Sequence, residues 1–261
     1  MAFSLLWLPG VLRAAGLVVQ EVPGWQNRGH GDEGKVLGVL CHHTCGPLHG
    51  DAPALNVVKD GRPDLEGPLA QLVLGRSGVF YVVAAGKCWH AGRGNWLGVK
   101  DGNSHFIGIE AENTGETRGP RADHWPDAQM DAYARGCAAI LKHIGAESAM
   151  CAGHKEYALP TGRKDDPNFD MGAFRARVAR VMGEMPAAPP PVKPAPRVGT
   201  VTTNDLALRK SPSAKSELVR RLKKGDKVTI TDDKMNDVTK WYGVEGGYVA
   251  ANYVTINKGE K

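Results

Sequence analysis

The hydrophobic pattern of residues 1–185 mixes two periodicities. Short apolar runs rich in Val, Ile, Phe and Tyr predict strands over residues 36–41, 79–85 and 106–112. Apolar residues at helical spacing predict helices over residues 129–144, stopped by Gly145, and 170–182, capped by Asp170. An amphipathic first helix is also predicted, because four leucines fall on one face: Leu5, Leu8, Leu12 and Leu17. Strands separated by helices predict an α/β domain, with a mixed central sheet flanked by helices.

The pattern changes after residue 197. Six short strand-like runs follow, over residues 198–201, 206–209, 218–222, 227–232, 241–244 and 247–249. Lys224-Gly225-Asp226 and Glu245-Gly246-Gly247 supply turns between them. Several short strands within about sixty residues predict a small all-β barrel.

A proline-rich segment separates the two patterns. Residues 186–197 read PAAPPPVKPAPR, with six prolines in twelve residues, which excludes a helix or an interior strand and favours extended polyproline II. We interpret it as a semi-rigid spacer. The predicted organisation is therefore a domain over residues 1–185, a linker over residues 186–197 and a second domain over residues 198–261.

Composition narrows the possible partners. Of the 261 residues, 42% are hydrophobic and 23% charged, which is ordinary for a soluble globular chain. The net charge of +5 comes from a basic surplus in the linker and C-terminal segment, which favours a polyanionic surface such as a bacterial wall. No strong Lys/Arg stripe is present, so we expect no nucleic-acid partner. No run of about 20 apolar residues predicts membrane insertion, and a monomer is the default expectation.

The N-terminus and the cysteines bear on location and redox state. No basic stretch precedes the first apolar residues, and Pro9-Gly10 and Arg13 interrupt them, so a signal peptide is not expected. We therefore expect a protein made in the host cytoplasm, which needs another route to reach a wall. The five cysteines are odd in number and form no CxxC pair, which predicts reduced, mostly buried thiols. Cys41 and Cys45 flank a histidine pair, so a thiolate ligand there stays open.

Three separated segments offer groups that could share one zinc ion. Residues 36–46 read VLGVLCHHTCG, residues 106–113 read FIGIEAEN, and residues 153–167 read GHKEYALPTGRKDDP. They supply histidine nitrogens, carboxylates and a lysine, which are the parts of a zinc hydrolase. Strand alternation places His42 and His43 on opposite faces, so only one of them is expected to reach the site.

Four motifs in order resemble a known family. VLCHHTCG, KCWHAG, FIGIEAEN and GHKEYALPTGRKDDP are similar to the motifs of type-2 N-acetylmuramoyl-L-alanine amidases, over most of residues 25–182. Residues 200–256, with NDLALRKSPSAKSE, LKKGDKV and WYGVEGGYVAANYV, resemble bacterial SH3-type wall-binding domains. The two-domain order resembles a phage or prophage endolysin, released to the wall by a holin; a host autolysin is the alternative origin.

The resemblance implies residue roles. It implies one Zn²⁺ per chain bound by His42, His154 and Asp166, with Asp165 the alternative third ligand. Glu110 is then the proton acceptor, and Lys164 stabilises the oxyanion. Substrate-binding roles fall to a further set: Trp89, His90, His43 and Asn113.

The implied substrate is bacterial peptidoglycan. The bond cleaved joins N-acetylmuramic acid to the L-alanine of the stem peptide. The alternative for the N-terminal domain is a recognition protein that binds peptidoglycan without cutting it. A zinc peptidase is less favoured, because the chain has neither an HExxH nor an HxH pattern at the required positions. Glu112 is expected to be a rim or structural carboxylate.

Overall fold

The protein is described here by a computed structural model that covers residues 3–185, 197–236 and 239–257. The chain divides into two compact units, Met1–Ala188 and Pro189–Lys261. Apart from Arg197, the predicted linker lies outside the described residues, so its boundaries stay a prediction. No helix within the described ranges combines the length and the apolar character needed to cross a bilayer.

A six-stranded mixed sheet forms the centre of the N-terminal unit, as predicted. Its order is β1-β6-β5-β9-β2-β10, and every neighbouring pair is parallel except β5 with β6. The strands are β1 (Val19–Glu21), β2 (Gly38–His43), β5 (Leu72–Leu74), β6 (Phe80–Val82), β9 (Phe106–Ala111) and β10 (Cys151–Gly153). Parallel pairing of β9, β2 and β10 brings the carboxyl ends of all three strands to one edge of the sheet.

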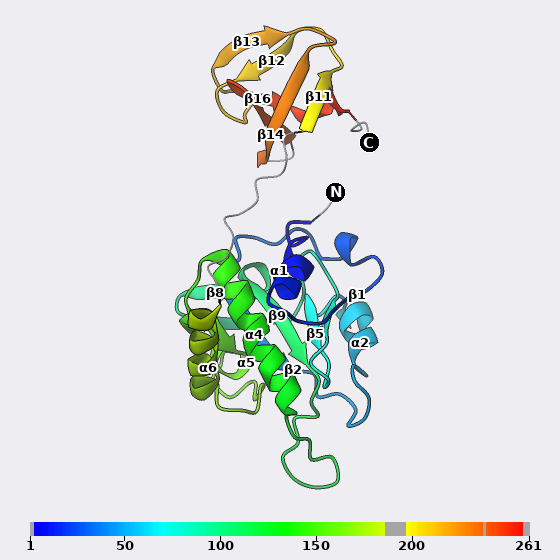
Figure 1. The fold of residues 1–261 in the computed structure, drawn as a ribbon, viewed down its shortest axis with the longest axis vertical. Helices are drawn as coiled ribbons and strands as arrows, with labels where there is room; N and C mark the ends of the chain where they lie inside the picture. Colours follow the sequence, from blue (N-terminus) through cyan, green and yellow to red (C-terminus); the bar gives the residue numbers. More distant parts are fainter. Residues whose placement is uncertain (1–2, 186–196, 237–238, 258–261) are drawn as a thin grey trace. The chain divides into compact units, whose positions relative to one another are not determined.

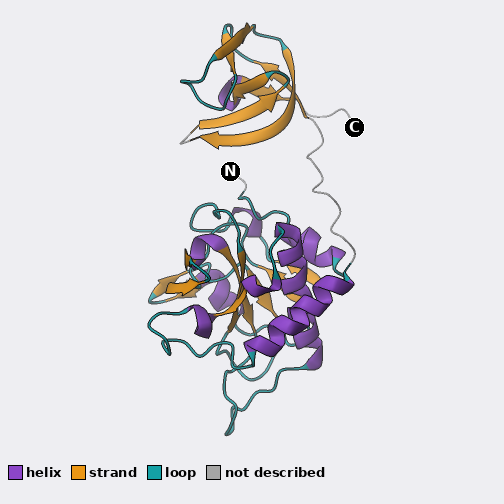
Figure 2. Cartoon of the chain, turned by 90° about the vertical axis from the view of Figure 1, so that its left-hand side faces the viewer, coloured by secondary structure: helices purple, strands orange, loops and turns teal. Residues whose placement is uncertain are grey.

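Three helices cover one face of this sheet. Figure 1 shows α1 (Leu8–Ala14), α4 (Asp127–Ile144) and α6 (Met171–Glu184) lying across the strands, and Figure 2 shows them gathered on one side. As predicted, Gly145 ends α4 in a left-handed conformation, and the Asp170 side chain caps α6 by accepting the N–H groups of Gly172 and Ala173. The first helix is shorter than predicted: all four leucines are buried, but Leu5 precedes it and Leu17 follows it.

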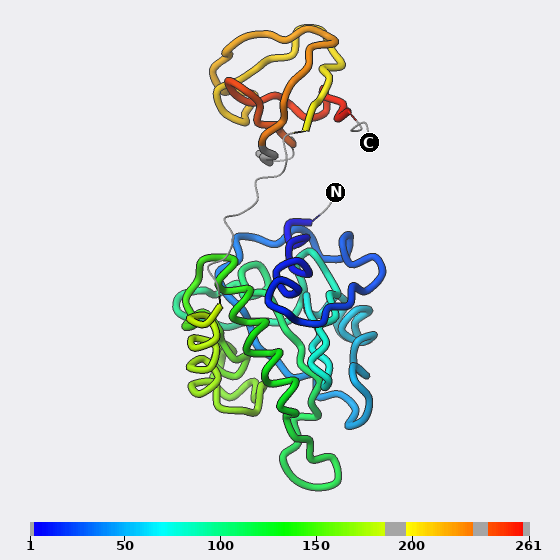
Figure 3. The backbone as a smooth tube through the Cα atoms, in the orientation of Figure 1, coloured from blue at the N-terminus to red at the C-terminus, as the bar shows by residue number. Residues whose placement is uncertain are grey.

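Shorter elements complete the unit. They are α2 (Leu55–Asp60), α3 (Gly102–His105), α5 (His154–Tyr157), the 3₁₀ turns η1 (Trp25–Asn27) and η2 (Ser148–Met150), and two hairpins, β3 (Gly61–Arg62) with β4 (Leu65–Glu66) and β7 (Arg93–Trp96) with β8 (Val99–Asp101). Figure 3 shows the long segment between β9 and α4 running out from the body of the unit and returning to the start of α4.

Alternation along β2 separates two environments. Val39 and Cys41 enter the main core beneath the helices, whereas Leu40 packs on the other face with Phe106 and Tyr157. Because side chains alternate along a strand, His42 follows Leu40 to the face away from α4. The sheet thus presents the first histidine of the pair on the side opposite the main core.

The C-terminal unit is an antiparallel seven-stranded sheet of order β13-β12-β16-β15-β14-β11-β17, which confirms the predicted small all-β domain. Its strands are β11 (Arg197–Val201), β12 (Leu206–Arg209), β13 (Leu218–Leu222), β14 (Lys227–Asn236), β15 (Thr239–Val244), β16 (Gly247–Ala250) and β17 (Val254–Ile256), with the turn η3 (Ala251–Tyr253) before the last. All six predicted runs are found. The prediction missed β17, which pairs with β11.

Candidate metal centre

Three side chains converge at the carboxyl-end edge of the sheet. His42 comes from the end of β2, His154 from the start of α5, and Asp166 from the segment between α5 and α6. The Nδ1 atoms of the two histidines are 3.0 Å apart, and Asp166 Oδ2 lies 3.0 Å from His42 Nδ1 and 3.1 Å from His154 Nδ1. All three residues are buried, whereas Asp165 is exposed. The geometry therefore joins Asp166, and not Asp165, to the histidines.

The spacing suits a shared cation. Nitrogen and oxygen ligands about 2.0–2.1 Å from a tetrahedral zinc ion lie roughly 3.3–3.4 Å from one another. The three donors would need to separate by only a few tenths of an ångström to reach that spacing. His42, His154 and Asp166 also form one of the two groups of three metal-type donors in the described part of the chain.

The protonation states also suit a metal. Burial, with the neighbouring His154, lowers the pKa of His42 to about 4, so its imidazole is neutral at neutral pH. Burial alone would raise the pKa of Asp166, but the adjacent His154 and His42 rings outweigh it and hold that pKa below its usual range. The cluster thus contains an ionised carboxylate and a neutral His42 ring, the forms in which these groups bind metal.

Hydrogen bonds on the far side of each ring determine where its proton lies. His154 Nε2 donates to the carbonyl of Ala91 at 3.0 Å, so in a neutral ring the lone pair lies on Nδ1. His90 Nε2 donates to the carbonyl of Phe106 at 3.2 Å, so His90 Nδ1 accepts from His42 Nε2 at 3.1 Å. His42 Nδ1 therefore also carries a lone pair. With these tautomers, two imidazole lone pairs and the Asp166 carboxylate oxygen face one another.

His90 is itself held in place by its surroundings. Asn103 Oδ1 accepts the backbone N–H groups of His90 and Ala91 at 2.9 and 2.8 Å. The imidazole packs over Gly108, where an added Cβ would lie 2.7 Å from His90 Cγ, so the glycine of the FIGIE run makes room for the ring. His90 is buried with both ring nitrogens engaged, and this position makes it a support for His42. Its predicted contact with substrate stays a prediction.

Glu110 lies beside the cluster because of strand register. His42 and Glu110 are paired residues of the parallel strands β2 and β9, so their side chains share a face. Glu110 Oε1 is 3.9 Å from His42 Nδ1, its side chain is 18% exposed, and Oε2 has no hydrogen-bond partner within the described residues. Burial and the charge of Asp166 raise the pKa of Glu110 to about 8, against the charge of Lys164. Lys164 is half-buried and close enough for its charge to act on this carboxyl group.

The remaining predicted residues have contacts of their own. His43 points to the other face of β2, toward Trp125, with ring centroids 6.5 Å apart. Trp89 stacks on His30 at 4.5 Å. Asn113 Oδ1 accepts the N–H of Gly115 at 2.9 Å, in the segment that follows β9. Their substrate contacts stay predictions.

Glu112 has a structural role, as expected. Its buried carboxylate accepts the Thr44 hydroxyl at 2.9 Å and the Ala54 N–H at 2.7 Å. These two bonds hold the segment that follows the histidine pair against the end of β9.

Two supports of the site were missed in the sequence. The Tyr133 hydroxyl accepts the N–H of His42 at 3.0 Å and lies 3.1 Å from the His42 and Ile109 carbonyls, although its helical pattern predicted only a core residue. Glu156 accepts two bonds from Arg175 of α6, at 2.6 and 2.9 Å, and the N–H of Gly153 at 3.0 Å. The acidic residue two positions after His154 was the available signal for this anchor.

Two histidines and a carboxylate that meet beside a second carboxyl group form the kind of site found in metallohydrolases. Residues 32–169 match the family model of N-acetylmuramoyl-L-alanine amidase, and residues 204–255 match the bacterial SH3 domain. Because the first match spans more than half of the 261 residues, the chain belongs to the N-acetylmuramoyl-L-alanine amidase family, and it is an enzyme of this kind. The predicted family resemblance is thereby confirmed for both units.

Solved structures with related folds include several amidases. A selenomethionine derivative of AmpD is 23% identical, with 68% of this chain and 99% of that chain covered and a TM-score of 0.44. The endolysin amidase LysCS from Clostridium intestinale is 17% identical, covering 61% and 94%, at a TM-score of 0.44. AmiD from E. coli, in complex with an anhydro-N-acetylmuramic acid peptide, is also 17% identical, covering 57% and 60%, at 0.44. No curated protein matches the sequence. The family assignment rests on the family match and not on these likenesses.

Proposed function

We propose that the chain is a zinc-dependent peptidoglycan amidase that hydrolyses the amide between N-acetylmuramic acid and the L-alanine of the stem peptide. One observation carries the zinc part of the proposal: His42 Nδ1, His154 Nδ1 and Asp166 Oδ2 meet at 3.0–3.1 Å, where all three atoms can face one cation. Such an arrangement of electron-pair donors is stabilised by a shared cation. Two histidines and one carboxylate are zinc ligands that leave a fourth position open.

The bound ion would supply a Lewis acid that lowers the pKa of water and polarises a carbonyl oxygen. Glu110 Oε2 has no hydrogen-bond partner among the described residues and lies on the same sheet face. A cation in the cluster would lower the raised pKa of Glu110. The ionised carboxylate can then take a proton from the attacking water and pass it to the leaving amine. The Lys164 ammonium group would stabilise negative charge that develops on the carbonyl oxygen. His90 and Ala91 hold the two histidine rings in the tautomers that this arrangement needs.

Metal analysis and product analysis together test the proposal. We expect one zinc per chain and release of stem peptides that begin with L-alanine, both read by mass spectrometry. Asp166→Asn should lose zinc and activity, whereas the neighbouring Asp165→Asn, whose side chain is exposed, should keep both. Glu110→Gln should keep zinc and lose activity by about 100-fold or more. Full activity after zinc removal, or equal effects of the two aspartate variants, would overturn the assignment.

We further propose that the C-terminal unit binds the bacterial wall and that the enzyme is a phage endolysin. The basic surplus of the C-terminal segment and the amidase–SH3 order support this proposal. Such an enzyme stays harmless in the host cytoplasm until a holin opens the membrane. Expression in bacteria should therefore lyse cells only after the membrane is permeabilised. Lysis without permeabilisation would contradict the release route and leave the amidase assignment untouched.

A further inference from the structure

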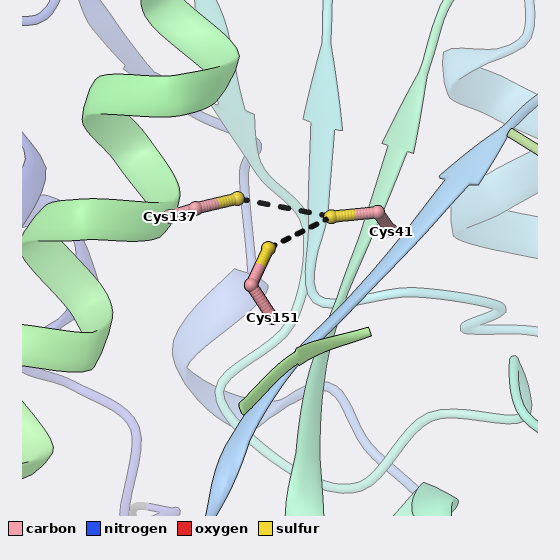
Figure 4. Close-up of side chains that lie close together, drawn as sticks. All are labelled: Cys41, Cys137 and Cys151. Atoms are coloured by element: carbon pink, nitrogen blue, oxygen red, sulfur yellow. Dashed lines mark hydrogen bonds between the residues drawn. The ribbon is translucent and has the colours of Figure 1, made fainter. Parts of the chain in front are cut away.

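Three thiols meet on the opposite face of β2 from the His–His–Asp cluster. Cys41 comes from β2, Cys137 from α4 and Cys151 from β10, and Figure 4 shows their sulfur atoms pointing toward one another. Cys41 Sγ lies 3.8 Å from Cys137 Sγ and 3.6 Å from Cys151 Sγ. All three side chains are fully buried, and all three thiols are free.

These sulfurs form the second group of three metal-type donors in the described part of the chain. All three Sγ atoms lie within 4.8 Å of one another. Thiolates about 2.3 Å from a shared ion would be roughly 4.0 Å apart in a trigonal arrangement. Small shifts of the side chains would therefore bring all three sulfurs to bonding distance.

The donor set selects the type of ion. Sulfur is a soft ligand, and the site has no carboxylate or imidazole among its three donors. The surrounding core is apolar and buried, so an ion that keeps water ligands is disfavoured. Cu(I) is a soft ion that accepts three sulfur ligands without water.

We propose that Cys41, Cys137 and Cys151 form a buried binding site for one Cu(I) ion, separate from the zinc site. Each thiol that binds as a thiolate releases one proton to solvent, and copper keeps its oxidation state. Because residues 41 and 42 face opposite sides of the sheet, β2 offers a soft donor to one site and a borderline donor to the other. Cu(I) is therefore expected at the three thiols, and zinc at the two histidines and the aspartate.

The test uses the zinc-loaded full chain under anaerobic, reducing conditions. Cu(I) is titrated in competition with a chromophoric Cu(I) chelator, and sulfur-to-copper absorption is recorded in the ultraviolet. We expect one Cu(I) per chain with zinc retained. Cys137→Ala should weaken Cu(I) binding at least about tenfold, equivalent to about 1.4 kcal/mol. Cys88→Ala and Cys45→Ala remove a buried and an exposed thiol outside the cluster and should leave the affinity unchanged.

Cys151→Ala serves as a second variant, and thermal unfolding of each variant shows whether it is folded. Three outcomes overturn the proposal: no sulfur-to-copper absorption, copper retention unchanged in both folded cluster variants, or loss of binding in Cys45→Ala. A thiol count completes the experiment. Loss of two thiols, counted after the copper is removed and the chain is unfolded, would identify the cluster as an oxidation site and is a fourth outcome that would overturn the copper assignment.

Discussion

The imidazole of His90 lies one hydrogen bond away from the metal-type donors. By accepting from His42 Nε2, it keeps the lone pair of His42 on Nδ1, where Asp166 and His154 lie. Partners of this kind orient metal ligands and raise their affinity. The residue that the sequence suggested as a substrate contact is therefore placed to act through a ligand.

His90→Ala should lower zinc affinity by about 10- to 100-fold, because His42 loses the partner that fixes its tautomer. His90→Asn should recover part of the affinity, since its side-chain oxygen can accept the same hydrogen bond. Competition against a zinc chelator measures both. The exposed His49→Ala is the control and should not change the affinity. Wild-type affinity in a folded His90→Ala protein would rule out this role.

Glu33 is a buried acid outside the active site. Its Oε2 accepts from Gln71 Nε2 at 3.2 Å, while Oε1 has no partner among the residues that the structure covers. Burial raises its pKa to about 8, with Lys87 opposing and Asp32 adding to the shift. The pKa of Glu33 is thus higher in the folded than in the unfolded protein. The stability that the protonated side chain contributes is therefore fully present below the unfolded pKa and is lost as the pH rises toward about 8.

Glu33→Gln should therefore stabilise the protein at and above neutral pH. The gain should grow from about pH 4.5 to about pH 8, by roughly 1.4 kcal/mol per pH unit at most, because the neutral amide never ionises. Urea unfolding at several pH values measures the difference. The exposed Glu66→Gln should stay within about 0.5 kcal/mol of the wild type at each pH. A pH-independent effect of Glu33→Gln would show that ionisation is not its cause.

At the scale of elements, long periodic segments could be predicted and three-residue strands could not. The two long helices were predicted to within two residues at each end, and β9 to within one residue. The strands β1, β5 and β10 have only three residues each, too few for a periodic pattern, and tertiary pairing determines them. The strand predicted over residues 79–85 shortens to Phe80–Val82 for the same reason.

The candidate site could also be predicted only in part. Its His, Asp and Glu residues stand in motifs that the sequence displays. The hydrogen bonds among His42, His90 and Phe106 join segments far apart in the chain, and no local pattern encodes them. The opposite faces of His42 and His43 could be predicted, because alternation is a local property of a strand.

The pair Glu156–Arg175 links the short helix that carries His154 to α6. Arg175→Ala should lower the free energy of unfolding by about 1–3 kcal/mol, because Glu156 keeps a partly buried charge without its partner. Zinc affinity should fall with it. The control on the same helix is Arg180→Ala, whose pair with Glu184 is 69% exposed on both sides and should contribute little. Chemical denaturation measures the change in stability, and chelator competition measures the change in zinc affinity. Equal results for Arg175→Ala and Arg180→Ala would contradict a role of the Glu156–Arg175 pair in holding His154.

At the scale of the whole molecule, each unit has a hydrophobic core of its own. The N-terminal core lies between sheet and helices, and the C-terminal core is made by β-strands alone. Two cores predict two unfolding transitions in the full chain. Zinc should raise only the transition of the N-terminal unit, because a ligand stabilises the unit that binds it.

Leu208→Ala should lower the free energy of unfolding of the C-terminal unit alone, by about 2–5 kcal/mol, since Leu208 is fully buried in the C-terminal core. Differential scanning calorimetry of the full chain, with and without zinc, resolves both effects. A single transition that responds to zinc and to Leu208→Ala alike would show that the units unfold together.

The register of β2 and β9 has a consequence for how such a chain can diverge. His42 and Glu110 are neighbours across a backbone ladder, so their separation is set by main-chain hydrogen bonds. Insertions and deletions in the connecting loops can accumulate without altering this distance. A single-residue deletion within residues 39–41 would instead turn every later side chain of β2 to the other face. Length variation among descendants of this sequence should therefore be confined to its loops.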